Sequence, residues 1–315
     1  MPRAWPAVQV VPRGGLAYGM QLPIVAQSPI FAQPWEAGAD TGDVVRIAQA
    51  CDRARFFYLA VSDHVCIPRD RATAMSTVWY DPVATLGFLA AATRHVRLLS
   101  YVYVLPYRHP LATAKAFATL DALSGGRVIL GAGAGHLEAE FQTLGVEFAR
   151  RGRLLDEAID VIVKAFLDEF PAHTGPTWTI RDMAVAPRPH QQPRPPIWVG
   201  GSTRGALRRA AERGDGWLPQ GVPPMGLAEA IAYIRRLRGD EPIEIGANSP
   251  WLYVGTPRFD LGPNARSGRG EAIAALLRDL QALGVSHVGV RFRTRSVDEL
   301  LEQIDAFARE VAPHL

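Results

Sequence analysis

Short runs of apolar and β-branched residues alternate along the chain with longer stretches of helical periodicity. Each apolar run is followed by a helical stretch or by a loop that contains one, an order typical of βαβ units with a parallel sheet. Eight such units predict an α/β protein, a single (β/α)8 TIM barrel with insertion loops at its C-terminal face. The runs that predict strands are Leu16–Leu22, Phe56–Val61, Val96–Leu105, Arg127–Leu130, Pro196–Val199, Gly216–Leu218, Ile243–Val254 and Val285–Phe292.

Helical periodicity covers the stretches between these runs, and several of them begin with residues that favour a helix start. Asp40 and Thr41 precede the first stretch as N-caps, whereas Pro82 and Pro110 stand in a first turn, where a missing N–H costs nothing. The stretches that predict helices are residues 42–54, 81–93, 109–123, 154–170, 204–213, 227–237, 270–283 and 297–311.

Two segments interrupt this alternation. Residues 171–196 are rich in proline and contain one β-like run at 177–180, and residues 257–269 form a second irregular stretch. Loops of this length in compact domains are usually lids or binding elements, so we interpret residues 171–196 as an insertion or lid. No linker is long and polar enough to divide the chain, which predicts one domain over residues 1–315.

Composition narrows the class of protein. Of the 315 residues, 48% are hydrophobic and 21% are charged, as in a soluble protein with a large core. No stretch approaches the roughly 20 apolar residues of a membrane helix, and the N-terminus lacks the apolar region of a secretory signal. Cys51 and Cys66 have neither disulfide-framework nor metal-ligand spacing. We therefore expect a cytoplasmic protein with reduced thiols, no metal site and no membrane contact.

The net charge of +3 comes almost wholly from arginine, since Lys115 and Lys164 are the only lysines. Arginine makes bidentate contacts with phosphate and carboxylate, so the excess fits an anionic small molecule, although compositional bias of the source genome explains it as well. No basic run is interleaved with aromatic residues, which excludes an evident nucleic-acid surface.

Candidate chemistry is sought directly after the strands, because the active site of a (β/α)8 barrel lies at the C-terminal ends of its strands. Ser62-Asp63-His64 follows the second strand. A carboxylate beside an imidazole can orient a cofactor and relay a proton near neutral pH. The alternative for this pair is a turn with a solvated histidine.

Two glycine-rich turns follow later strands. Residues 131–136 alternate glycine and alanine and end in His136, so a ligand can approach the backbone closely, but their spacing departs from the dinucleotide-binding fingerprint. Residues 200–203 open a helix with two glycines and two hydroxyls, a geometry suited to phosphate. The alternative there is a capped helix start without a ligand. Aromatic residues are frequent in the first half of the chain. We expect most of them to pack in the core or in a lid, and one or two to face a flat ring. They are Trp35, Trp79, Tyr80, Tyr101, Tyr103 and Tyr107.

Several motifs occur together and in register between about Leu16 and Pro219. They include Leu105–Pro110, Thr119–Arg127, Leu130–Gly135, Glu140-Phe141, Arg151–Arg153, Pro196–Ser202 and Gly214–Trp217. This combination resembles the luciferase-like monooxygenase superfamily, whose members use FMN or the deazaflavin coenzyme F420. Ser62-Asp63-His64 is similar to the Ser-Asp-His of the F420-dependent branch.

The resemblance implies roles for these residues. Asp63 would contact the deazaflavin, and His64 would lie near the hydride-transfer carbon as the proton donor or acceptor. A non-prolyl cis peptide at Tyr101–Val102 would press against the middle ring of the cofactor. The phosphate would be bound by Gly200, Gly201, Ser202 and Thr203, and the ribityl chain or ring edge would be lined by Ala134, Gly135 and His136.

The function expected from the resemblance is a coenzyme F420-dependent oxidoreductase that acts on a small organic substrate, as a homodimer. The alternatives are an FMN-dependent monooxygenase that uses reduced flavin and O2, and a non-catalytic barrel that carries a flavin. His136 stands where some sugar-phosphate dehydrogenases of this branch have a carboxylate, which argues against that substrate. The substrate would be selected by residues 23–35, 171–196 and 257–269, whose specificity the sequence does not reveal.

Overall fold

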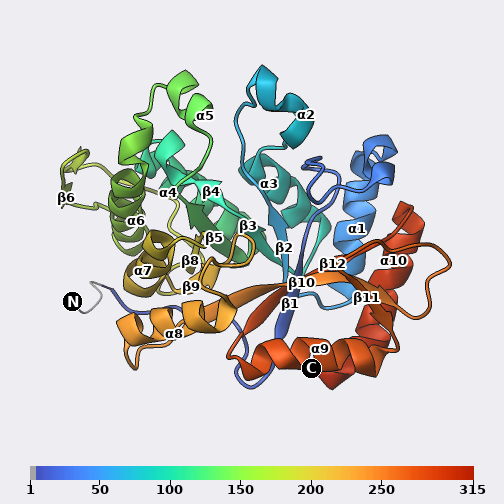
Figure 1. Ribbon diagram of the computed structural model, residues 1–315. Coiled ribbons are helices and arrows are strands. Elements are labelled where there is room, and N and C mark those ends of the chain that lie inside the picture. The colour runs from blue at the N-terminus through green and yellow to red at the C-terminus, as the bar shows by residue number, and fades with distance from the viewer. Residues whose placement is uncertain (1–4) are drawn as a thin grey trace.

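The protein is a closed barrel of parallel strands surrounded by helices (Figure 1). The computed structural model describes residues 5–315, and within them eight strand positions close the ring in the order β1-β2-β3/β4-β5-β8-β9-β10-β12-β1. The strands are β1 (Ala17–Gln21), β2 (Tyr58–Val61), β3 (Arg97–Ser100) with β4 (Tyr103–Val104), β5 (Val128–Gly133), β8 (Ile197–Gly200), β9 (Gly216–Leu218), β10 (Glu244–Val254) and β12 (His287–Phe292). The predicted (β/α)8 barrel and its eight strands are confirmed.

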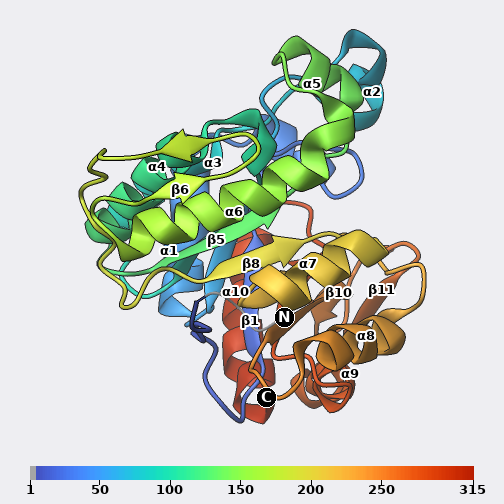
Figure 2. The ribbon, with the colours of Figure 1, turned by 90° about the vertical axis from the view of Figure 1, so that its left-hand side faces the viewer.

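Helices cover the outer face of this ring (Figure 2). They are α1 (Thr41–Arg53), α3 (Pro82–Ala92), α4 (Pro110–Ser124), α6 (Arg151–Leu167), α7 (Arg204–Arg213), α8 (Leu227–Arg238), α9 (Gly270–Ala282) and α10 (Val297–Ala306). Two short helices, α2 (Ala72–Met75) and α5 (Glu138–Thr143), both lie beyond one end of the barrel in Figure 2. Among residues 5–315, no helix combines the length and the apolar composition needed to cross a membrane.

The helix starts follow from local sequence. The Asp40 side chain accepts a hydrogen bond from the Asp43 amide at 3.0 Å and caps α1, and Asp81 caps α3 in the same way ahead of Pro82. Both carboxylates satisfy an amide that has no acceptor within its helix, which stabilises a helix by about 1 kcal/mol. Of the two predicted N-caps of the first helix, Asp40 is confirmed, whereas Thr41 is the first residue of α1.

Apolar side chains fill two layers. The larger layer lies between the strands and the helices, and a smaller one inside the barrel is formed by Tyr58, Ala60, Leu99, Ile129, Trp198 and Leu218. The N-terminal segment covers the end of the barrel where the strands begin, since the amides of Val10 and Val11 both donate to the Glu244 carboxylate at 2.6 Å. The opposite end, where the strands finish, holds the predicted site residues.

Several boundaries differ from the expected ones. The expected strand Val96–Leu105 is broken between β3 and β4, because Ser100 bonds to Gly131 through its side chain and the backbone then leaves the sheet. The strand expected at Arg127–Leu130 continues to Gly133, and the helix expected to run to Val311 ends at Ala306 and continues as a π-turn over Phe307–Val311.

The two segments read as irregular are partly ordered. Residues 257–269 contain β11 (Ala265–Gly268), which pairs in parallel with β10, so the expected structureless loop is wrong. Residues 171–196 contain a hairpin of β6 (His173–Thr174) and β7 (Thr179–Ile180). Glu157 of α6 holds this hairpin by accepting hydrogen bonds from the Thr177 and Trp178 amides. Its role as a lid stays a prediction.

Candidate active site

The residues predicted from the sequence converge at the C-terminal ends of the strands. Asp63 and His64 follow β2, Tyr101 and Val102 separate β3 from β4, and residues 134–136 follow β5. Residues 200–203 connect β8 to α7. Because neighbouring parallel strands end at the same edge, these segments share one rim of the barrel.

Val102 occupies the gap between two neighbouring strands. The peptide bond between Tyr101 and Val102 is cis, as the resemblance implies. The isopropyl group of Val102 packs against Gly133 of β5 and Gly200 of β8, and a Cβ atom added to either glycine would overlap it. The glycines of these two turns therefore make room for a side chain of the protein as well as for a ligand.

Asp63 is engaged by the protein itself. Its carboxylate forms a bidentate ion pair with Arg108, at 2.6 and 2.9 Å, and accepts the Val104 amide at 2.8 Å. Arg108 also lies over the ring of Tyr103, 4.0 Å from its centroid. Asp63 is buried, so these contacts fix the position of the β4 backbone. Contact between Asp63 and the cofactor stays a prediction.

His64 is held by a buried glutamate that the sequence analysis assigned no role. Its Nδ1 lies 2.9 Å from Oε2 of Glu140 in α5, and the Tyr107 hydroxyl donates to the same oxygen at 2.7 Å. Oε1 of Glu140 accepts the amides of Val65 and Cys66 at 2.6 and 3.1 Å. With Nδ1 taken, Nε2 is the ring atom of His64 for which no partner is found among residues 5–315.

The charge of Glu140 is maintained by these donors. Burial alone would raise the pKa of its carboxyl, but the hydrogen bonds from His64, Tyr107 and the Cys66 amide outweigh it, and the pKa lies below its ordinary value. Hydrogen bonds to the charged form stabilise it. The Glu140 carboxylate therefore stays charged beside the His64 imidazole at physiological pH.

Aromatic rings surround His64. Trp79 lies edge-on to it with centroids 4.5 Å apart, and His136 lies edge-on at 5.5 Å. Phe31 in turn packs on Trp79 at 6.0 Å. Of the predicted lining residues after β5, His136 is exposed, and Ala134 and Gly135 are half-buried at the rim. The structure thus brings His136 and His64 together.

The turn between β8 and α7 leads directly into a helix start, and the Gly201 amide in it donates to the Leu218 carbonyl at 3.0 Å. The Thr203 side chain caps α7 by accepting the Ala206 amide, and the Ser202 hydroxyl donates to the Gln220 carbonyl at 2.9 Å. Both hydroxyls are therefore already used within the protein. The first-turn amides of a helix have no intrahelical acceptor and carry partial positive charge, so they, more than the hydroxyls, suit a phosphate.

A second group of polar side chains lies across the mouth, at the ends of β1, β10 and β12. Gln21 donates to the Ser62 hydroxyl at 2.9 Å, and Ser62 donates to the Tyr101 carbonyl at 3.1 Å. The Tyr101 hydroxyl donates to the Pro219 carbonyl at 2.6 Å, and Asn248 donates to that carbonyl too. Gln21, Tyr101 and Asn248 line a small hollow in the barrel mouth together with Arg291.

Sequence reasoning assigned no polar role to Tyr107, Arg108, Glu140 or Arg291, and it named Tyr107 only among the aromatic rings that could face a flat cofactor. The first three lie inside motifs that carried the family resemblance, Leu105–Pro110 and Glu140-Phe141, so their position was marked but their function was not. No local pattern distinguishes Arg291 from the other arginines. Among the described residues, no cluster of His, Cys, Asp and Glu has the arrangement of a metal site.

These residues fit a flat, anionic redox cofactor. The glycine ends of β5 and β8 accommodate the Val102 side chain, and the helix start of α7 offers amides to a phosphate. The Nε2 atom of His64 has no partner among residues 5–315. A larger side chain at either glycine would displace Val102. The chemistry of this donor set therefore matches a flavin or deazaflavin mononucleotide portion.

Comparison with known proteins shows the family of this chain. The luciferase-like monooxygenase family matches residues 20–257. An uncharacterized protein of Mycobacterium tuberculosis is 32% identical over 69% of this chain and 77% of its own. The F420-dependent hydroxymycolic acid dehydrogenase of M. tuberculosis is 31% identical over 68% of this chain and 59% of its own. The oxygenase component of a flavin-dependent trigonelline monooxygenase from Acinetobacter baylyi is 29% identical over 55% and 46%.

Solved structures share the fold at low sequence identity. The monooxygenase RslO1 from Streptomyces bottropensis superposes with a TM-score of 0.79 at 20% identity, covering 95% of this chain and 99% of its own. The coenzyme F420-dependent tetrahydromethanopterin reductase from Methanopyrus kandleri has a TM-score of 0.72 at 18% identity, covering 96% and 99%. The family match spans more than half of the chain, and this protein therefore belongs to the luciferase-like monooxygenase family, whose members are oxidoreductases that use coenzyme F420 or flavin.

Proposed function

We propose that this enzyme is a coenzyme F420-dependent oxidoreductase that transfers a hydride between the deazaflavin and a small organic substrate. The observation that carries the proposal is the His64–Glu140 pair, which follows Ser62-Asp63 at the end of β2. That tripeptide resembles the F420-dependent branch, and an F420-dependent dehydrogenase is among the relatives. A histidine held at Nδ1 by a buried carboxylate is oriented for proton transfer at Nε2.

Different residues at the rim would bind different parts of the cofactor. The amides at the start of α7 would bind its phosphate, Val102 would support one face of the ring, and residues 134–136 would line its edge. When bound, the deazaflavin supplies a two-electron carrier that accepts or donates a hydride. Asp63, by pairing with Arg108 and the Val104 amide, keeps the β4 backbone beneath that position.

His64 would handle the proton that accompanies the hydride. Its Nδ1 stays on Glu140, and its Nε2 gives a proton to a substrate oxygen or takes one from it. Glu140 stabilises the imidazolium form electrostatically, and Trp79 covers one side of the ring and limits its contact with water. The direction of net transfer depends on the substrate.

Titration of the purified protein with F420 and with FMN, followed by absorbance and fluorescence, tests this proposal. We expect F420 to bind at least about tenfold more tightly than FMN, a difference of about 1.4 kcal/mol. A matched variant, His64→Asn, should keep F420 affinity within a few fold and lose hydride transfer to any substrate that the wild type accepts. Tight FMN binding without F420 binding would reject the proposal.

A second candidate is an FMN-dependent monooxygenase fed with reduced flavin by a separate reductase. Two similarities favour it, the flavin-dependent trigonelline monooxygenase in sequence and the monooxygenase RslO1 in structure. Oxygen consumption that requires both the protein and reduced FMN would support it, and its absence with excess reduced FMN would remove it.

A cytoplasmic homodimer is the assembly we propose in either case, to be checked by the mass in solution.

A further inference from the structure

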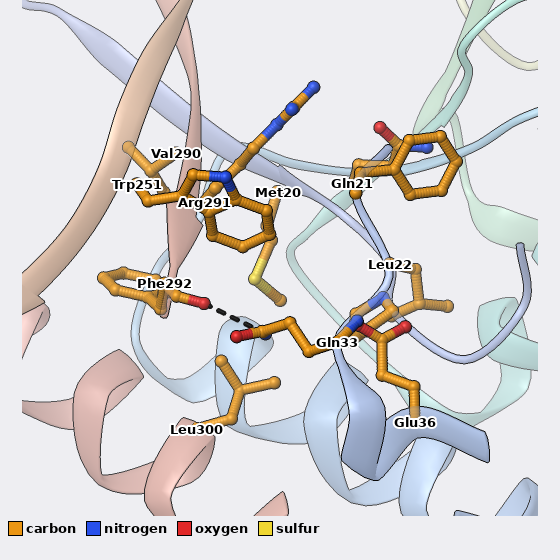
Figure 3. Close-up of a pocket in the computed structure, with 12 residues that line it drawn as sticks. Met20, Gln21, Leu22, Gln33, Glu36, Trp251, Val290, Arg291, Phe292 and Leu300 are labelled. Carbon is orange, nitrogen blue, oxygen red and sulfur yellow. Dashed lines mark hydrogen bonds between the residues drawn. The ribbon is translucent and has the colours of Figure 1, made fainter. Parts of the chain in front are cut away.

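A cavity opens beside the barrel mouth, between the ends of β1 and β12 and beneath the segment that follows β1. It has a volume of about 410 Å³ when its open mouth is included. Its walls are mostly apolar, formed by residues such as Met20, Leu22, Phe31, Trp251 and Phe292. Figure 3 shows these side chains around the cavity, with Arg291 extending along its upper side.

Two of the polar groups in this wall are already satisfied. The Glu36 carboxylate accepts the amides of Ile24 and Gln33, both at 2.8 Å. The Gln33 side chain donates to the Phe292 carbonyl at 3.1 Å and accepts the Thr294 amide at 2.8 Å. Both groups hold the segment after β1 in place, and in Figure 3 they lie on the side of the cavity away from the Arg291 guanidinium.

Arg291 is different. Among residues 5–315, no carboxylate lies within ion-pairing distance of its guanidinium, and no hydrogen-bond acceptor is found for it. Its nearest assigned partner is the ring of Trp251, the residue opposite it in the β10–β12 register, at 6.0 Å from the centroid. Arg293 lies over the same ring at 4.2 Å and adds a second positive charge nearby. A half-buried cation without a counter-ion in an apolar cavity favours an anionic ligand.

The cavity adjoins the hollow in the barrel mouth, and ring contacts link its wall to His64. Arg291 and Gln21 line both the cavity and the hollow in the barrel mouth. Phe31 of the cavity wall packs on Trp79, and Trp79 packs on His64 with centroids 4.5 Å apart. Two aromatic rings in succession, Phe31 and Trp79, thus lie between a ligand in the cavity and the imidazole of His64.

We propose that this cavity is the substrate site and that the substrate is an apolar organic acid. Its carboxylate would pair with the Arg291 guanidinium, and its hydrocarbon or ring portion would lie against Met20, Leu22 and Phe292. A carboxylate matches a single guanidinium in a planar, bidentate pair, whereas a phosphate dianion needs more donors than this wall provides. The assignment of the cavity as a substrate site rests on the proposed function of the same barrel mouth.

Binding of matched acid and neutral probes to the cofactor-free protein tests this inference. Isothermal titration calorimetry would compare octanoate and 3-phenylpropionate with 1-octanol and 3-phenylpropanol, and with phenyl phosphate. We expect each carboxylate to bind at least about tenfold more tightly than its alcohol, and more tightly than the phosphate ester. The Arg291→Gln variant should lose this preference. Arg266→Gln, which removes an equal charge from exposed β11, should keep it.

The cofactor titrations separate this inference from the proposed function. Arg291→Gln should bind F420 or FMN as the wild type does, which also shows that the variant is folded. The assignment would be overturned if the wild type bound acids and alcohols equally or bound phenyl phosphate more tightly than the acids. It would also be overturned if Arg291→Gln kept the acid preference or lost cofactor affinity. A protein that prefers the acids through Arg291 but binds neither cofactor would refute the proposed function and leave the acid site standing.

Discussion

Four hydrogen-bond donors from two segments converge on the carboxylate of Glu140. The Val65 and Cys66 amides follow β2, the Tyr107 hydroxyl precedes α4, and His64 supplies Nδ1. The side chain of Glu140 is fully buried. A buried carboxylate of this kind both positions the imidazole and ties α5 to the β2 loop, so its removal should affect stability and activity separately.

We expect Glu140→Gln to lower the free energy of unfolding by about 2 to 4 kcal/mol at pH 7, because the amide nitrogen cannot accept a hydrogen bond and leaves buried donors without a partner. The pKa of Glu140 is lowered in the folded protein, so its stabilisation is present above the ordinary value of 4.5 and is lost as the pH falls through the folded pKa. Urea unfolding at pH 7 and pH 4 should therefore show a smaller difference between variant and wild type at the lower pH.

The control for Glu140→Gln lies in the same helix. Glu138 is exposed in α5, and Glu138→Gln should change stability by less than about 0.5 kcal/mol. If Glu140→Gln were as stable as Glu138→Gln and turned over substrate at the wild-type rate, the proposed role of Glu140 as the positioning residue for His64 would be wrong.

At the scale of elements, the mouth is shaped by strands that end in glycine. Gly133 of β5 and Gly200 of β8 both contact the isopropyl group of Val102, which comes from the break between β3 and β4. Three strands thus meet through one small side chain. The position of Val102 depends on the absence of a Cβ atom at two places that are distant in sequence.

Gly200→Ala should therefore displace Val102, lower stability by about 1 to 3 kcal/mol and weaken cofactor binding by at least about tenfold. Gly205→Ala is the matched control, because Gly205 is the second residue of α7 and a Cβ atom added to it would stand in open space. That variant should be unchanged or up to about 1 kcal/mol more stable. Equal cofactor affinity in the two variants would contradict this view of the rim.

Local sequence was sufficient for most elements, because hydrophobic periodicity records which face of each element is buried. It predicted α7 at Arg204–Arg213 and β9 at Gly216–Leu218 with their observed bounds. It did not predict the break after Ser100, since that break depends on a contact with Gly131, which is 31 residues away. The helix α5 was missed because its six residues are too few to show a period.

The site was predictable only where a motif marked it. Ser62-Asp63-His64 and residues 200–203 were expected at the rim because they directly follow predicted strands, and the family resemblance then gave them roles. The structure places both segments there. Glu140 contacts His64 although 76 residues of sequence separate them. No carboxylate among residues 5–315 pairs with Arg291. Both facts depend on tertiary arrangement, which no spacing along one chain encodes.

At the scale of the whole molecule, the two ends of the barrel differ in their charged groups. At the end away from the site, Trp198 lies between two buried titratable residues: it stacks on His287 with centroids 4.1 Å apart, and its Nε1 donates to Glu244 at 2.6 Å. Burial lowers the pKa of His287 to about 3. Burial also raises the pKa of Glu244 to about 7, against the lowering effect of the Val11, Val10 and Trp198 hydrogen bonds.

These two shifts act on stability in opposite directions. His287 has a lowered folded pKa, so the unfolded chain gains its proton first and stability falls as the pH drops from about 6.5 towards 3. Glu244 has a raised folded pKa, so the folded protein gains its proton first and stability rises as the pH drops from about 7 towards 4.5. Between pH 7 and pH 4.5 each effect amounts to roughly 3 kcal/mol, and in the wild type they largely cancel.

Replacing either Glu244 or His287 alone should reveal the effect of the other residue on how stability changes with pH. Glu244→Gln should lose about 3 kcal/mol more than the wild type on acidification from pH 7 to pH 4.5, because only the His287 effect remains. His287→Phe, which keeps an aromatic ring on Trp198, should gain a similar amount relative to the wild type over the same interval. Urea unfolding of the two variants and of the double variant at both pH values measures this difference, and all other titrating groups cancel in the comparison. If stability changed with pH in the same way in the wild type and both single variants, the pKa values of His287 and Glu244 would not be shifted as their burial implies.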